Sequence, residues 1–89
     1  MKNLKHFIDQ ENRMAELFDK PQMDVNNLTV EDANALFCII DLRLSPEWLY
    51  RDGEATRAEA RRTAKYLNAA AKELKSLGFK VPANVYELQ

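Results

Sequence analysis

One stretch of the sequence, residues 29–45 (TVEDANALFCIIDLRLS), holds the densest run of large apolar side chains in the chain. It begins with Thr29, whose hydroxyl can accept a hydrogen bond from the backbone N–H of Asp32, and the Asp32 carboxylate can reach back to Thr29. At about 100° per residue, one side of a helix over 29–44 collects the apolar side chains that a core requires. They are Val30, Ala33, Leu36, Phe37, Ile40 and Leu44. The stretch therefore predicts a central helix on which the other elements pack.

The same helix carries a second apolar strip, roughly opposite the first. It consists of Ala35, Ile39 and Leu42, which follow one another at helical spacing. A surface helix needs only one apolar face, so a second strip indicates that something else covers it. The candidates are the C-terminal tail over 79–89, a second copy of the chain, or another protein. We predict that this strip is a contact surface.

The N-terminal segment over 3–19 predicts an amphipathic helix, with Pro21 just beyond its end. Its apolar stripe is formed by Leu4, Phe7, Ile8, Met14, Ala15 and Phe18. Glu11 falls at the centre of that stripe, where a carboxylate is costly unless it is paired. We expect Glu11 to meet a partner on another helix, with Arg62 and Tyr66 as the candidates.

Two further helices follow from start and stop signals. A short corner helix is expected over 46–51, and the longest helix over 56–77, which Gly78 ends. The tail over 79–89 is too apolar to remain in solvent and is expected to fold back as an extended segment. Its apolar residues are Phe79, Val81, Val85, Tyr86 and Leu88. The predicted fold is all-α: one domain over 1–89, with a three-helix bundle, a corner helix and a packed tail.

The corner helix contains two large aromatic residues, Trp48 and Tyr50. Such residues either plug the end of a bundle or serve as an exposed anchor for a partner. The sequence leaves both alternatives open, the buried one being the commoner for large aromatics.

The longest helix carries a ridge of cations on the side away from its apolar face. The ridge consists of Arg57, Arg61, Lys65, Lys72 and Lys75. It can face solvent, an acidic protein or a nucleic-acid backbone, but the net charge of −1 weighs against nucleic acid. The sequence does not match a DNA-binding helix-turn-helix motif with Gly53 in its turn, because the positions that would pack the two helices together are charged. We keep the ridge as a candidate acidic-partner or phosphate-binding face.

The chain lacks the residue patterns of catalytic and metal sites. It has one histidine, His6, and one cysteine, Cys38, which fall on different predicted helices. A lone cysteine forms neither an internal disulfide nor a zinc site with a second cysteine. No apolar run approaches the roughly 20 residues of a membrane span. We therefore expect a cytoplasmic protein that is no enzyme, with no cofactor, no metal and no membrane partner.

These observations favour a role in binding. We expect a small helical protein–protein interaction module that acts as an inhibitor, adaptor or assembly subunit and binds another protein or itself. Its size is typical of phage and mobile-element proteins. Binding of a nucleic-acid backbone through the basic ridge is the alternative.

Overall fold

The computed structural model describes residues 2–85, apart from the side chain of Asp52, and all regular structure in that range is helical. The elements are α1 (Lys2–Leu17), α2 (Val30–Arg43), α3 (Pro46–Leu49), the short 3-10 turn η1 (Arg51–Gly53) and α4 (Arg57–Ser76). The predicted all-α bundle with a corner helix is confirmed, and each helix boundary lies within two residues of the predicted one.

Local hydrogen bonds explain where α2 begins and where α4 ends. The Thr29 hydroxyl accepts from the Asp32 backbone N–H at 3.0 Å, and the Asp32 carboxylate accepts from the Thr29 N–H at 3.1 Å. At the other end, Gly78 has a φ of +98° and donates to the Lys75 carbonyl at 2.9 Å. Glycine adopts that left-handed conformation readily, so it ends the helix there.

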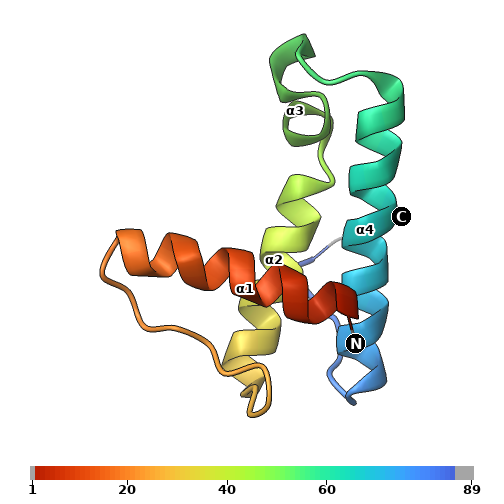
Figure 1. The fold of residues 1–89 in the computed structure, drawn as a ribbon. Helices are drawn as coiled ribbons and strands as arrows, with labels where there is room; N and C mark the ends of the chain where they lie inside the picture. Colours follow the sequence, from red (N-terminus) through yellow and green to blue (C-terminus); the bar gives the residue numbers. More distant parts are fainter. Residues whose placement is uncertain (1, 86–89) are drawn as a thin grey trace.

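The three long helices do not all run alongside one another (Figure 1). α2 and α4 pack side by side, and α3 and η1 form the corner that joins them at one end. α1 lies across both helices, and its C-terminal half projects past α2. The connector over 18–29 is held on α1 by Asn12, whose side-chain amide exchanges two 2.8 Å hydrogen bonds with the Met23 backbone. With this connector, α1 crosses α2 rather than running antiparallel to it.

The core forms where α1, α2 and α4 meet. Its buried residues are Leu4, Phe7, Ile8, Ala33, Leu36, Phe37, Ile40, Leu67, Ala70, Ala71 and Leu74. Small alanines on α4 let the bulkier side chains of α1 and α2 approach closely. Phe79 and Val81 pack against this cluster, so the described part of the tail folds back as predicted. Tyr86 and Leu88 lie outside the described residues.

Three residues of the apolar stripes predicted for the first two long helices are exposed. Met14 and Phe18 lie on the end of α1 and just beyond it, where the helix has passed α2 and no neighbour covers it. Val30 is 65% exposed because it is the first residue of α2, at the end of the bundle next to the connector. The predicted stripes were therefore too long at both of these helix ends.

Candidate functional site

A groove lies in the angle between the projecting half of α1 and the segment that contains α2, α3 and η1. It consists of two depressions of about 460 and 300 Å³ that share Gln10 and Arg43. The larger one is bounded by α4 as well, and the smaller one extends along α1 toward its C-terminal end. The remaining lining residues are His6, Glu11, Arg13, Met14, Leu17, Trp48, Arg51, Thr63, Tyr66 and Leu67. We refer to both depressions together as the arginine groove.

The floor of the arginine groove is an ion pair between α1 and α2. Glu11 Oε1 lies 2.7 Å from an Arg43 guanidinium nitrogen, and the Glu11 side chain is only 12% exposed. Oε1 accepts no well-aligned hydrogen bond, so the attraction between the two groups is mainly electrostatic. The Arg43 guanidinium also lies 5.7 Å from the centre of the Phe7 ring, within the range of a cation–π contact. This pair joins α1 to the C-terminal end of α2 at the point where the two helices cross.

The prediction for Glu11 was therefore right in kind and wrong in partner. Glu11 pairs with Arg43 on α2, and neither Arg62 nor Tyr66 on α4 takes that role. The reason is the crossing of α1, which carries Glu11 past α4 to the C-terminal end of α2. Nothing in the apolar spacing of either helix reports that crossing.

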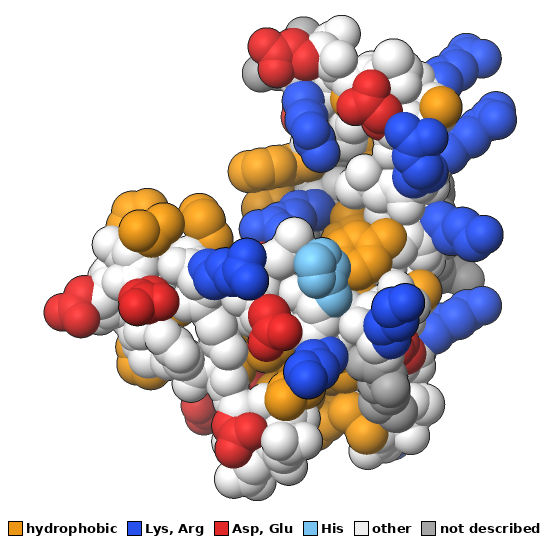
Figure 2. All heavy atoms as spheres, in the orientation of Figure 1, with side chains coloured by type: hydrophobic (Ala, Val, Ile, Leu, Met, Phe, Trp, Pro, Cys, Tyr) orange, Lys and Arg blue, Asp and Glu red, His pale blue; other side chains and the backbone are white. Residues whose placement is uncertain are grey.

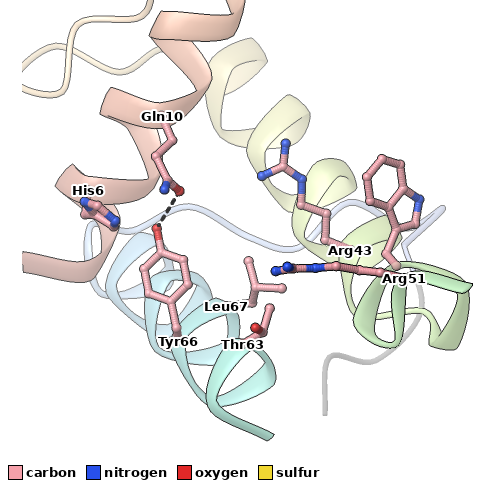
Figure 3. Close-up of a pocket in the computed structure, with 8 residues that line it drawn as sticks. His6, Gln10, Arg43, Arg51, Thr63, Tyr66 and Leu67 are labelled. Carbon is pink, nitrogen blue, oxygen red and sulfur yellow. Dashed lines mark hydrogen bonds between the residues drawn. The ribbon is translucent and has the colours of Figure 1, made fainter. Parts of the chain in front are cut away.

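Tyr66 forms the wall of the groove on the α4 side. Its hydroxyl lies 3.5 Å from the Gln10 side-chain oxygen, a long contact for a hydrogen bond (Figure 3). Its ring meets His6 and Phe7 edge to face, with centroids 5.6 and 6.4 Å away. The pKa of Tyr66 is raised to about 12, chiefly by burial; Arg43 acts in the opposite direction, and the nearby Glu11 and Glu73 add to the rise. Tyr66 is therefore a neutral, fixed part of the wall at physiological pH.

Trp48 and Arg51 form the opposite wall. Trp48 is 52% exposed and Tyr50 is exposed as well, so the alternative in which they plug the bundle end is wrong. Trp48 lines the groove, whereas Tyr50 does not. Arg51 extends into the larger depression toward Leu67 and Tyr66 (Figure 3). Among the residues that the structure describes, no carboxylate forms an ion pair with Arg51.

Arg51 also has an uncommon backbone conformation, with a φ of +47°. A non-glycine residue there costs roughly 1–2 kcal/mol relative to the right-handed region. Such strain tends to persist at functional positions. The turn over 51–53 places the Arg51 side chain at the groove at that cost.

The apolar strip on α2 is not uniformly exposed, and none of its three residues lines the groove. Ile39 is half-buried and packs against the core, while Ala35 is exposed and Leu42 is 54% exposed. Ile39 precedes Arg43 by one helical turn and so neighbours it on the surface of α2, whereas Leu42 adjoins Arg43 in the sequence but lies about 100° away around the helix. Phe79 and Val81 pack on the core, and Leu42 remains uncovered by the described residues. Figure 2 shows hydrophobic side chains on the projecting end of α1 and on the facing α2–α3 segment.

The basic ridge occupies a different surface. Its five cations, Arg57, Arg61, Lys65, Lys72 and Lys75, are all exposed. Figure 2 shows Lys and Arg side chains along the outer side of α4, away from the arginine groove. The ridge and the groove are therefore two separate candidate surfaces.

Several groove residues escaped the sequence analysis. Arg13, Arg43 and Arg51 come from three separate elements, and no local spacing links them. Arg43 offered the one available signal, since it falls between the two apolar sides of α2 on a helical wheel. In the described part of the chain, no cluster of three or more His, Cys, Asp or Glu side chains is arranged to hold a metal ion.

Comparisons with protein-family models, curated proteins and solved structures gave no match. Within residues 2–85, none of the helices has both the length and the apolar character needed to cross a membrane.

Proposed function

We propose that this chain is a protein-binding module and that the arginine groove is its contact surface. The observation that supports the proposal is the exposed apolar surface on both sides of one concave angle. Met14 and Leu17 line it on α1, and Trp48 lines it on α3. Leu42, near the end of α2, lines neither depression but is exposed as well. A concave surface of this kind, with a tryptophan next to arginines, has the composition of a binding hot spot.

The exposed apolar residues of the groove would supply part of the free energy of binding. Burying a leucine side chain that was exposed contributes roughly 1.5–3 kcal/mol, and an aromatic anchor contributes at the upper end of that range. Leu17, Leu42 and Trp48 together would contribute roughly 5–9 kcal/mol before the cost of association, which is itself roughly 4–15 kcal/mol, so other contacts in the groove have to add to them. The role as inhibitor, adaptor or assembly subunit, and a binding rather than an enzymatic activity, are part of this proposal.

Affinity capture with matched variants tests the proposal. Trp48→Ala and Leu42→Asp are expected to lose the partner while retaining wild-type helicity and melting temperature. Val30→Asp is the matched control, because Val30 is equally apolar and exposed on the same helix but lies at its other end. Loss of the partner in Val30→Asp alone, or in none of the three, would contradict the proposal.

A second candidate function is binding of a nucleic-acid backbone by the basic ridge. The observation that favours it is that five cations are exposed along one helix, with no acid paired to any of them among the described residues. Such binding weakens steeply with salt, because the cations displace counterions from the phosphates. Arg61→Glu combined with Lys65→Glu should abolish retardation of DNA or RNA at about 50 mM salt. A wild-type chain that retards neither nucleic acid at that salt concentration excludes this function.

A further inference from the structure

We infer that the occupant of the arginine groove is an amphipathic helix of another protein, with carboxylates beside its apolar face, and that Arg51 binds one of those carboxylates. The inference rests on the proposed function, since it names the chemistry of the partner at the same surface. It follows from the shape of the groove, its charge and the state of its arginines.

The shape of the groove suits a helix. Its walls are helices, and their exposed apolar residues recur at one-turn spacing, as Met14 and Leu17 do on α1. A partner helix fits such a surface by placing apolar residues at matching one-turn intervals. A partner strand would need an unpaired strand edge, and residues 2–85 contain no strand. The helix-in-groove mode is therefore the one that this surface supports.

The charge of the groove selects an acidic partner. Its lining contains three arginines, Arg13, Arg43 and Arg51, and one acid, Glu11, which Arg43 already pairs. Within the described chain, Arg13 and Arg51 form no ion pair. Glu47 and Glu54 line an adjoining depression that shares Trp48 and Arg51 with the groove, and neither pairs with Arg51. A basic partner would meet uncompensated like charges, whereas carboxylates would form charge-assisted hydrogen bonds with the guanidinium groups.

The same charges disfavour a second copy of this chain as the occupant. In a two-fold symmetric dimer the same surface meets itself, so two arginine grooves would face each other. That arrangement would bring Arg13, Arg43 and Arg51 of both copies together. A foreign acidic helix avoids this repulsion and uses the same apolar contacts.

Arg51 is the residue whose role the structure defines best. Its guanidinium extends into the larger depression, and its backbone is in the left-handed region. Since glycine would occupy that backbone position without strain, the arginine there costs stability that its side chain does not recover in an ion pair with any described residue. A carboxylate from the partner would supply the missing contact.

The test uses the intact chain and two synthetic helical peptides of about 16 residues, long enough to follow the groove at 1.5 Å per residue. Both have leucine at one-turn spacing and differ only in carrying glutamate or lysine at the flanking positions. Trp48 is the only tryptophan in the chain, so its fluorescence reports occupation of the groove. The glutamate peptide is expected to bind at least about tenfold more tightly than the lysine peptide, and its affinity should fall with added salt.

Two variants locate the carboxylate contact. Arg51→Glu should weaken binding of the glutamate peptide by about tenfold or more and bring its affinity toward that of the lysine peptide. Arg57→Glu, an equal change of charge on the basic ridge, should alter the affinity less than about twofold, since its site lies outside the groove. Arg51→Gly removes the side chain and relieves the backbone strain, so this variant should fold at least as well as the wild type. It should also weaken binding of the glutamate peptide.

The outcomes separate the inference from the proposed function. Equal binding of the two peptides, or insensitivity to Arg51→Glu in a folded protein, overturns the inference. Mass measurement that shows a concentration-dependent dimer, dissociated by Leu17→Asp, overturns it in favour of a second copy. If Trp48→Ala and Leu42→Asp still lose a captured partner while Arg51→Glu retains it, the proposed function stands and only the acidic helix is wrong.

Discussion

The two halves of α1 have the same helical spacing of apolar residues and very different surroundings. In the first half, Leu4, Phe7 and Ile8 are completely or almost completely buried against α2 and α4. In the second half, Met14 is 47% exposed and Leu17 is 78% exposed. The comparison teaches that an amphipathic pattern indicates a face that needs covering, but not whether the covering comes from the same chain. The first half of α1 therefore contributes to the core, and we propose that the second half serves in binding.

The two regions are expected to differ most in how far replacement of a phenylalanine by alanine lowers the free energy of unfolding. Phe7→Ala should lower the free energy of unfolding by about 3–5 kcal/mol, because it leaves a cavity where α1, α2 and α4 meet. The same substitution at Phe18, which is 66% exposed, should change it by about 0.5 kcal/mol or less. Urea unfolding followed by circular dichroism measures both values. A comparable loss in the two variants would show that the end of α1 is packed in solution.

The next largest effect is expected for the ion pair between Glu11 and Arg43, where the two halves of α1 meet. In a double-mutant cycle, Glu11→Ala and Arg43→Ala should show a coupling of about 1–2 kcal/mol, because each single change leaves a partly buried charge unpaired. The matched cycle of Glu11→Ala with Arg62→Ala should show almost none. Coupling to Arg62 with none to Arg43 would mean that α1 crosses the bundle differently.

A smaller effect, of opposite sign, is expected at Arg51, on the wall of the groove opposite α1. Arg51→Gly should raise the free energy of unfolding by about 0.5–1 kcal/mol, since glycine adopts a positive φ without strain. Arg62→Gly, in the exposed middle of α4, should lower it by about 1 kcal/mol. Thermal melting distinguishes the two signs. Destabilisation by Arg51→Gly would show that Arg51 contributes contacts within the fold.

The smallest effect concerns Tyr66, which packs against the first half of α1. Its pKa is raised from 10 to about 12, so the folded state holds the proton more tightly than the unfolded state. The contribution of the neutral phenol to stability is therefore fully present below about pH 10 and is lost as the pH rises toward 12. Absorbance titration of tyrosinate should show a late phase that Tyr66→Phe removes. Titration of Tyr66 at the ordinary pKa of tyrosine would show that this wall of the groove is open to solvent.

Much of the fold was predictable because local chemistry determines it. The capping box at Thr29, the stop at Gly78 and the helical spacing of apolar residues each act within a few positions along the chain, and they place the helices to within two residues. The crossing of α1 was not predictable from those signals. It depends on long-range contacts such as the pair between Glu11 and Arg43, which no local pattern reports.

The candidate site was predictable only in part. The exposed Leu42 and Trp48 were both singled out by the sequence, one as part of a second apolar strip and the other as an aromatic anchor. Arg13, Arg43 and Arg51 were not, because arginines on three elements look like ordinary surface charges until the fold brings them to one groove. Their role as a binding site stays a prediction.

The most direct test of the division within α1 is the substitution Leu17→Asp, with stability and partner binding measured on the same preparation. Leu17 is the most exposed large apolar residue of the described chain and lines the arginine groove. We predict an unchanged melting temperature and loss of the captured partner. A variant that melts several degrees lower, or one that retains the partner at wild-type affinity, would contradict the assignment of this half of α1 to binding.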